Sequence, residues 1–126
     1  MKDPALSKAE LIVRTAKKHK AYDLVLLKVS ELTSLADYFF ICSCRSSRQV
    51  QAVSEHMLFE AKKKGGFKTL GVEGRTQGQW VLLDFGEVVA HIFYEPLRKF
   101  YDLESLWSEA PRVNIGPEAE REVEEE

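Results

Sequence analysis

Acidic residues gather around one candidate turn of the sequence, where they could support metal-assisted chemistry. Asp84 and Glu87 flank Gly86, and Asp37 precedes an apolar run earlier in the chain. Metal-assisted phosphoryl transfer needs carboxylates that converge on one ion, commonly as an Asp-x-Asp pair on one face of a strand. Positions 82 and 86 hold Leu and Gly, so Asp84 has no such neighbour. The carboxylates therefore do not predict a catalytic metal site.

A serine-rich turn at residues 43–48 precedes a predicted helix, and the N-terminus of a helix can bind phosphate. Arg45 and Arg48 flank the turn, but it lacks the glycines that let a backbone wrap around a phosphate. This absence excludes a P-loop or a dinucleotide fingerprint. Ser46 and Gln49 have the spacing of a capping box, so helix capping is the better interpretation of Ser46.

The cysteines and histidines do not have the spacing of a metal site. Cys42 and Cys44 would point the same way from one strand, but zinc usually takes four ligands and the sequence has no other cysteine. His19, His56 and His91 are scattered. We interpret the two thiols as small buried side chains and predict neither a metal nor another cofactor. The sequence also lacks a nucleophile elbow, so we predict that the protein is not an enzyme.

The segment that positions these residues is a predicted β-hairpin at residues 78–94. Two β-rich runs, 80–85 and 88–94, flank a Gly86-Glu87 pair, which is the pattern of a tight two-residue turn. Because side chains alternate along a strand, one face of this hairpin is entirely apolar and predicts a core face. The residues of that face are Val81, Leu83, Phe85, Val88, Ala90 and Ile92.

The second face of the predicted hairpin, called the mixed face below, combines apolar and polar side chains. Its residues are Trp80, Leu82, Asp84, Val89, His91 and Phe93. A face with large aromatic side chains beside a carboxylate and an imidazole is either covered incompletely by its own chain or kept for a partner. The mixed face is therefore the candidate binding surface of this sequence.

The rest of the chain predicts an α/β fold with a mixed sheet of about five strands and helices mainly on one face. A capping box of Ser7 and Glu10 predicts the start of the first helix, and Gly65-Gly66 predicts the end of the second. The strand at 22–29 is apolar on both faces, which is typical of a strand inside a sheet. The predicted helices span 7–18, 46–64, 95–100 and 103–107, and the remaining strands span 37–42 and 67–72. The β-α-β portion predicts a right-handed parallel crossover.

Length and charge predict one domain followed by a tail. The chain has 126 residues, of which 44% are hydrophobic and 30% charged. Residues 111–126 contain six glutamates, two arginines and few apolar side chains, so we expect a domain over 1–110 and an acidic, disordered tail over 111–126. Without the tail the chain has 16 basic and 14 acidic residues, an excess too small to predict general nucleic-acid binding.

No membrane or secretory signal is visible in the sequence. No apolar run approaches the roughly 18 residues of a membrane span. The N-terminus has neither the hydrophobic core of a signal peptide nor the character of a transit peptide. Cys42 and Cys44 lie too close together to join distant parts of a domain by a disulfide. We therefore expect a cytoplasmic protein with reduced thiols.

Several motifs between residues 7 and 108 are similar, in the same order, to those of the Iojap family of ribosomal silencing factors. That family has an ADYF-type strand, a serine-rich turn before a helix, an EG pair, a hairpin of the type WVLLDxGDVVxHxF, and a closing helix of the type RxF/YYxLExLW. The corresponding residues are 36–39, 46–48, 73–74, 80–93 and 98–107. Cys44 and Gln49 depart from the family pattern, which usually has Gly and commonly His at these positions.

The resemblance implies a translation factor without catalytic activity. Family members bind the large ribosomal subunit through its protein numbered fourteen, on the inter-subunit surface. They block joining of the small subunit, lower translation under nutrient limitation, and are often homodimers when free. Their fold is similar to that of nucleotidyltransferases without the active site, so a nucleotide-binding protein of that fold is the alternative. A general RNA-binding module is a further alternative, which the nearly neutral charge of residues 1–110 disfavours.

Together, the mixed face and the resemblance predict a protein-binding site rather than a sequence-specific nucleic-acid site. Acidic residues near the hairpin would suit a basic ribosomal protein. The expected partner-binding residues are Trp80, Leu82, Asp84, Val89, His91, Phe93, Glu73, Glu87, Tyr94 and Arg98. Trp80 is the expected anchor, because large aromatic side chains commonly dominate the binding energy of interfaces.

Overall fold

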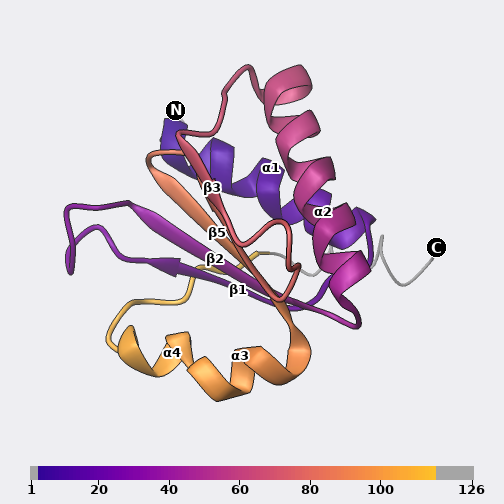
Figure 1. Cartoon of the computed structure of the whole chain (residues 1–126). Coiled ribbons are helices and arrows are strands. Elements are labelled where there is room, and N and C mark those ends of the chain that lie inside the picture. Colours follow the sequence, from indigo (N-terminus) through magenta and orange to yellow (C-terminus); the bar gives the residue numbers. More distant parts are fainter. Residues whose placement is uncertain (1–2, 116–126) are drawn as a thin grey trace.

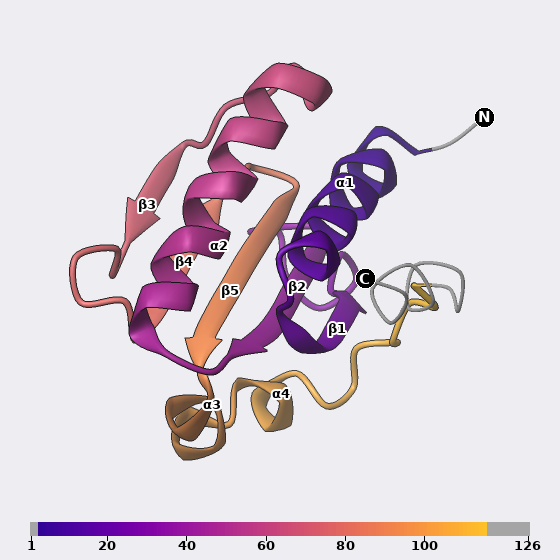
Figure 2. The same ribbon diagram turned by 90° about the vertical axis from the view of Figure 1, so that its right-hand side faces the viewer.

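The computed structural model describes residues 3–115, which form a five-stranded mixed sheet with helices on both faces. The strand order is β1-β2-β5-β4-β3. The two longest helices, α1 and α2, lie side by side across one face, while α3 and α4 lie against the other (Figures 1 and 2). The elements are α1 (Pro4–Lys18), β1 (Tyr22–Lys28), β2 (Tyr38–Cys44), α2 (Ser47–Glu60), η1 (Ala61–Gly65), β3 (Gly71–Glu73), β4 (Trp80–Asp84), β5 (Val88–Tyr94), α3 (Glu95–Tyr101) and α4 (Leu103–Leu106). The predicted α/β class is confirmed.

Helix α1 starts three residues earlier than the capping box of Ser7 and Glu10 predicted. Asp3 is the N-cap, and its side chain accepts a hydrogen bond from the backbone N–H of Ala5 at 3.1 Å. Pro4 suits the first turn, since its fixed φ matches a helix and its missing N–H would have no partner there. Ser7 instead donates its backbone N–H to the carbonyl of Asp3 within the helix.

Helix α2 begins as the sequence predicted. The hydroxyl of Ser46 accepts a hydrogen bond from the backbone N–H of Gln49 at 3.0 Å, so Ser46 is the N-cap. The side chain of Gln49 does not complete the capping box, because its Oε1 accepts from the backbone N–H of Arg45 at 2.7 Å. The helix ends in the π-helical turn η1, and Gly66, with a φ of 71°, stops it.

Three of the four strand pairs are antiparallel, and one is parallel. Strand β2 pairs with β5 in parallel, which requires the predicted crossover through α2. Strand β3 is shorter than the predicted strand at 67–72 and begins later in the sequence, at Gly71, where it pairs with β4. Residues 67–70, which were predicted as the start of this strand, lie before it. The backbone N–H of Phe67 bonds to the carbonyl of Ala61, and the backbone N–H of Leu70 bonds to the carbonyl of Asp84.

Strand β1 lies at an edge of the sheet, so the prediction of an interior strand is wrong. Its outer side is nevertheless paired with a later segment: Lys28 N–H bonds to the carbonyl of Pro111 at 2.9 Å, and Val113 N–H bonds to that of Leu26 at 2.8 Å. Leu27 and Arg112 form an antiparallel bridge. Residues 111–115, called the C-terminal strap below, therefore cover this edge. Both faces of β1 are apolar for a different reason: Leu26 belongs to the core under α1 and α2, whereas Val25 and Leu27 belong to the cluster under α3 and α4.

The strap also corrects the expectation of a solvated tail that begins at Pro111. Val113 and Ile115 pack against the hydrophobic core between the sheet and α1–α2. An exposed acidic tail cannot begin before these apolar contacts end. Residues 116–126, which make up the rest of the predicted tail, lie outside the described residues.

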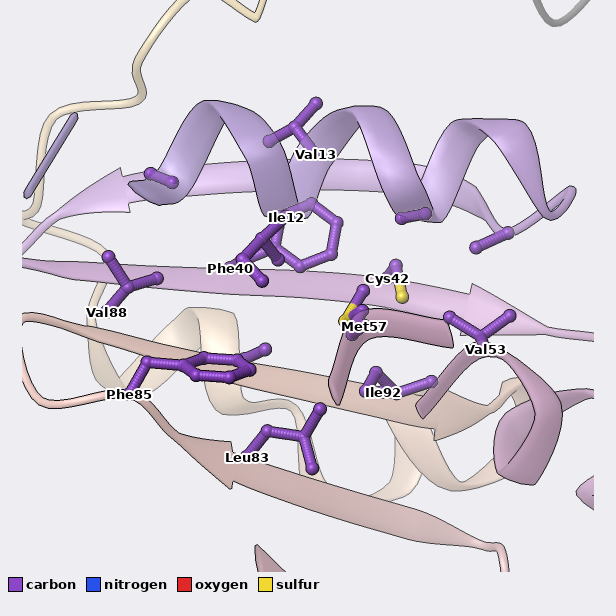
Figure 3. Packing of buried hydrophobic residues seen from close by; sticks show 14 of the residues in the cluster. Ile12, Val13, Phe40, Cys42, Val53, Met57, Leu83, Phe85, Val88 and Ile92 are labelled. Carbon is purple, nitrogen blue, oxygen red and sulfur yellow. The ribbon is translucent and has the colours of Figure 1, made fainter. Parts of the chain in front are cut away.

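The main core lies between the sheet and α1–α2 (Figure 3). Ile12 of α1 and Met57 of α2 point toward Phe40 of β2 and toward the hairpin, and all three are buried. The six residues predicted for the apolar face of the hairpin all belong to this core and are buried. Within residues 3–115, no helix combines the length and the apolar character that crossing a membrane requires.

Candidate partner-binding site

The β4–β5 hairpin has the predicted register. Trp80 pairs with Phe93, and Leu82 pairs with His91. The two-residue turn is closed by a hydrogen bond from Phe85 N–H to the Val88 carbonyl at 2.9 Å. Gly86 has a φ of 89°, a left-handed conformation that glycine adopts without a steric penalty. The hairpin therefore divides its side chains into the two faces that the sequence predicted.

Helices α3 and α4 cover only part of the mixed face. His91 and Phe93 are 5% and 0% exposed. The rings of Phe39 and Trp107 meet edge to face at 5.0 Å, and Phe39 makes a similar contact with His91 at 5.4 Å. These contacts form a second hydrophobic cluster on this side of the sheet. His91 and Phe93, which we expected to contact a partner, are therefore buried by the chain itself.

The part of the mixed face formed by β4 and the start of β5 remains partly open. Trp80, Leu82 and Val89 are each half-buried. Tyr101, in the last turn of α3, is 48% exposed, and its ring lies 4.9 Å from that of Trp80. We call these four residues the docking patch. Tyr101 was not among the expected site residues, because nothing in the sequence indicated that the end of this helix would pack against Trp80.

Trp80 is held in place by contacts within the hairpin. Its ring stacks on that of Phe93 at 4.9 Å, and its Nε1 donates a hydrogen bond to Nδ1 of His91 at 3.2 Å. The β3–β4 loop passes close by, since a Cβ at Gly74 would lie 2.0 Å from the carbonyl oxygen of Trp80. Gly74 also has a φ of 81°. A half-buried aromatic side chain in a defined orientation can act as an anchor without a large loss of entropy on binding.

His91 supports this arrangement as a neutral imidazole. Burial lowers its pKa from 6.5 to about 4, because the charged form loses its hydration. Nδ1 accepts from Trp80, so the proton of the neutral ring is on Nε2. That Nε2 is buried and has no hydrogen-bond partner among the described residues. His91 therefore orients Trp80 and carries no charge toward a partner at neutral pH.

The predicted acidic residues lie in different surroundings. Glu73 is exposed and pairs with Leu82 in the β3–β4 ladder, so it borders the docking patch. Asp84 is half-buried, and its Oδ1 accepts from the turn N–H of Gly86 at 2.8 Å. Glu87 forms an ion pair with Lys8 of α1 at 2.8 Å, and this hydrogen bond lowers its pKa. Glu73 and Asp84 form an acidic rim, whereas Glu87 joins the turn to α1.

The last two expected residues do not belong to the docking patch. Tyr94 packs against the core on the α1–α2 side of the sheet. Arg98 is 9% exposed and binds both carboxylate oxygens of Glu104, at 2.9 and 3.1 Å. It also donates to the carbonyl of Asp23 and to the hydroxyl of Ser43. Arg98 therefore joins α3 and α4 to β1 and β2, beside a polar cleft of about 460 Å³.

The comparisons with known proteins agree with the fold and the motifs. The family model described as "Ribosomal silencing factor during starvation" matches residues 2–126. The chain belongs to this family. A ribosomal silencing factor from Halalkalibacterium halodurans is 38% identical over 84% of this chain and 90% of its own. One from Bacillus subtilis is 36% identical over 76% of this chain and 80% of its own. A crystal structure of a Chromobacterium violaceum protein superposes with a TM-score of 0.80 at 32% identity, over 86% of this chain and 88% of that one.

As a ribosomal silencing factor, the chain belongs to a family that works without catalysis. Within residues 3–115, no three His, Cys, Asp or Glu side chains come together as metal ligands. Cys42 and Cys44 are buried, and burial raises the pKa of Cys42 well above the ordinary thiol value. A thiol in this state is unreactive, so the cysteines have a packing role in the core.

Proposed function

We propose that this silencing factor docks onto a protein of the large ribosomal subunit, the one numbered fourteen on the inter-subunit surface. The occupied surface is then closed to the small subunit, so the two subunits do not join and translation falls under nutrient limitation. The observation that carries this proposal is the docking patch, a group of half-buried and exposed apolar side chains that the chain covers only in part.

The composition of the patch supports a protein partner. It combines two aromatic side chains, Trp80 and Tyr101, with two aliphatic ones, and aromatic residues are enriched at the centres of interfaces. Glu73 and Asp84 at its rim complement a basic ribosomal protein and would steer its approach. A standard interface buries about 800 Å² on each partner, which the hairpin and α3 can largely supply. Steric exclusion of the small subunit needs no reacting group.

Sedimentation of separated ribosomal subunits tests the proposal directly. We expect the protein to sediment with the large subunit alone and, at saturation, to suppress formation of joined ribosomes. If joined ribosomes form at the same level with saturating protein, the proposed mechanism is wrong.

A matched pair of aromatic substitutions locates the contact. Trp80→Ala should weaken binding to isolated ribosomal protein fourteen by at least about thirtyfold, since truncation of a central anchor costs about 2 kcal/mol or more. Phe59→Ala removes an aromatic ring that is 56% exposed on α2 and should leave affinity unchanged. Because Trp80→Ala also removes packing on Phe93, Glu73→Lys serves as a second variant that changes only the rim. Equal affinities for wild type, Trp80→Ala and Glu73→Lys would contradict this docking patch.

We further propose that the free protein is a cytoplasmic homodimer. The partly covered docking patch supports self-association, because apolar surface that remains accessible commonly marks an interface. Light scattering on Trp80→Ala would separate two arrangements. A monomeric variant would place the dimer contact on the docking patch, whereas an unchanged dimer would place it elsewhere.

A further inference from the structure

The charges of this chain are divided between the two sides of the sheet. The segments that build the α1–α2 side, residues 3–20 and 45–68, contain eleven Lys and Arg against four Asp and Glu. Residues 69–115 include the docking patch, α3 and α4. They contain four basic and seven acidic residues. The nearly neutral total charge of the sequence therefore conceals a positive side and a negative side.

The two helices that carry most of these positive charges, α1 and α2, run antiparallel and touch. The last turn of α1 meets the first turn of α2, where Nε2 of Gln49 donates to the carbonyl of Lys20 at 3.1 Å. Farther along, the rings of His19 and His56 stack at 3.5 Å. Glu60 of α2 has a lowered pKa, first through its hydrogen bond with Lys64 and then through the charges of Lys64, Lys18 and His19. Cations from both helices thus act on the same region.

Several of these cations are available to a ligand. Arg14 and Lys18 are exposed on successive turns of α1, Arg48 is exposed in the first turn of α2, and Lys62 is exposed in η1, which follows α2. None of these four side chains forms an ion pair with another residue of the described segment 3–115. We call the surface that they mark the basic layer. By contrast, Arg98 and Arg112, on the α3–α4 side, are both paired with Glu104.

The composition of the basic layer suits phosphate better than protein. Protein interfaces are depleted in lysine at their centres and need apolar anchors. The large exposed apolar side chain of α2 is Phe59, and Nζ of Lys63 lies 5.4 Å from the centre of its ring. Flexible lysines spaced along two helices instead match a row of backbone phosphates, which bind cations without reference to base sequence.

We propose that the basic layer is a second binding surface, which takes the phosphate backbone of an RNA duplex. This inference goes beyond docking onto a ribosomal protein, because it uses the opposite side of the sheet (Figure 2). A protein held through its docking patch leaves α1 and α2 free to contact ribosomal RNA nearby. Two separate contacts on one particle strengthen each other, since the second forms at a high effective concentration.

Two pairs of substitutions with the same change in net charge test the proposal. Arg14→Gln with Lys18→Gln neutralises two cations of the basic layer. Lys28→Gln with Lys99→Gln neutralises two exposed cations on β1 and α3, outside the layer. The probe is a fluorescently labelled RNA duplex, titrated by each protein over a series of KCl concentrations. A third variant, Arg48→Gln with Lys62→Gln, tests whether the surface includes α2 and η1.

The wild type should bind the duplex with an affinity that falls steeply with salt. Each lost phosphate contact lowers the slope of log affinity against log salt by about one, so either basic-layer variant should lower it by about two. The control variant should keep the wild-type slope. The proposal would be overturned if the control and basic-layer variants lost RNA affinity and salt slope equally. It would also be overturned if the wild type did not bind the duplex at low salt.

Further arms separate this surface from the docking patch and from other partners. Trp80→Ala should keep its affinity for the RNA duplex, while the basic-layer variants should keep theirs for isolated ribosomal protein fourteen. Failure of the ribosomal-protein interaction would thus leave the RNA result intact. If the basic-layer variants lose affinity for large subunits but not for the RNA duplex, the layer binds an acidic protein and the RNA proposal is wrong.

Discussion

The two faces of the β4–β5 hairpin differ in how completely the chain covers them. On one face every side chain is buried beneath α1 and α2, helices of 15 and 14 residues. On the other, α3 and α4 have 7 and 4 residues, and they bury Phe93 while Trp80 and Leu82 remain half-buried. The length of the covering helices thus separates a face that stabilises the fold from a face that is available for binding.

Two neighbouring leucines in β4 provide the strongest test of this difference. Leu83 is fully buried in the main core, whereas Leu82 belongs to the docking patch. Leu83→Ala should lower the free energy of unfolding by about 2–5 kcal/mol, because it leaves a cavity among packed side chains. Leu82→Ala should cost less than about 1.5 kcal/mol, since water already reaches that side chain. Chemical denaturation of both variants measures these values.

The same two variants should show the opposite order in binding. Leu82→Ala should weaken the complex with ribosomal protein fourteen, while the folded fraction of Leu83→Ala should bind with the affinity of the wild type. If both substitutions destabilise the protein equally, the division between a stabilising face and a binding face does not hold.

His91 tests how firmly α3 and α4 close their part of the mixed face. The folded protein holds the pKa of this imidazole at about 4, against 6.5 for an ordinary histidine, so the unfolded state binds a proton first as the pH falls. The stabilising effect of the neutral ring is complete above pH 6.5 and is lost between pH 6.5 and about 4. The loss should approach about 3 kcal/mol.

His91→Gln isolates this effect from other titrating groups. Glutamine stays neutral throughout and can still accept a hydrogen bond from Trp80. The stability difference between wild type and variant should therefore change with pH in the stated range, with the wild type losing more at low pH. A constant difference between pH 7 and pH 4 would show that His91 is hydrated and that the cover is loose.

The strap tests the edge of the sheet and should have the smallest of these effects. Truncation after Ala110 removes two hydrogen bonds to β1 and the packing of Val113 and Ile115. We expect a loss of about 2 kcal/mol, seen as a decrease of several degrees in the thermal midpoint. Truncation after Ile115 is the control and should leave the midpoint unchanged. An unchanged midpoint in both truncations would show that the strap does not stabilise β1.

The sequence predicted the hairpin well because its signals are local. A glycine in the turn, alternation along both strands and an apolar face together determine the register, and Phe85, Leu83 and Val81 all lie where expected. The N-cap of α2 at Ser46 was predictable for the same reason. The start of α1 was not predictable in this way. Asp3 and Ser7 both suit an N-cap, and the choice between them depends on Pro4.

The incorrect predictions concern contacts between distant segments. An apolar strand such as β1 indicates that both of its faces are covered, but it cannot indicate that residues 111–113 occupy its outer edge. Burial of His91 and Phe93 likewise depends on where α3 and α4 pack. For Arg98, the partners Asp23 and Ser43 lie more than fifty positions away along the chain, so its role in joining elements had no local signal.

The strap has a consequence for the order in which this chain can fold. The outer edge of β1 is paired only when Leu27 bridges to Arg112, which is synthesised 85 residues later. During synthesis the N-terminal helix and the first two strands leave the ribosome well before that segment. Until then β1 is an open, apolar strand of the kind that pairs with other unfinished chains. Pairing of the strap with β1 is therefore a late step in folding. The shorter the time for which β1 remains unpaired, the more monomeric native protein should be recovered.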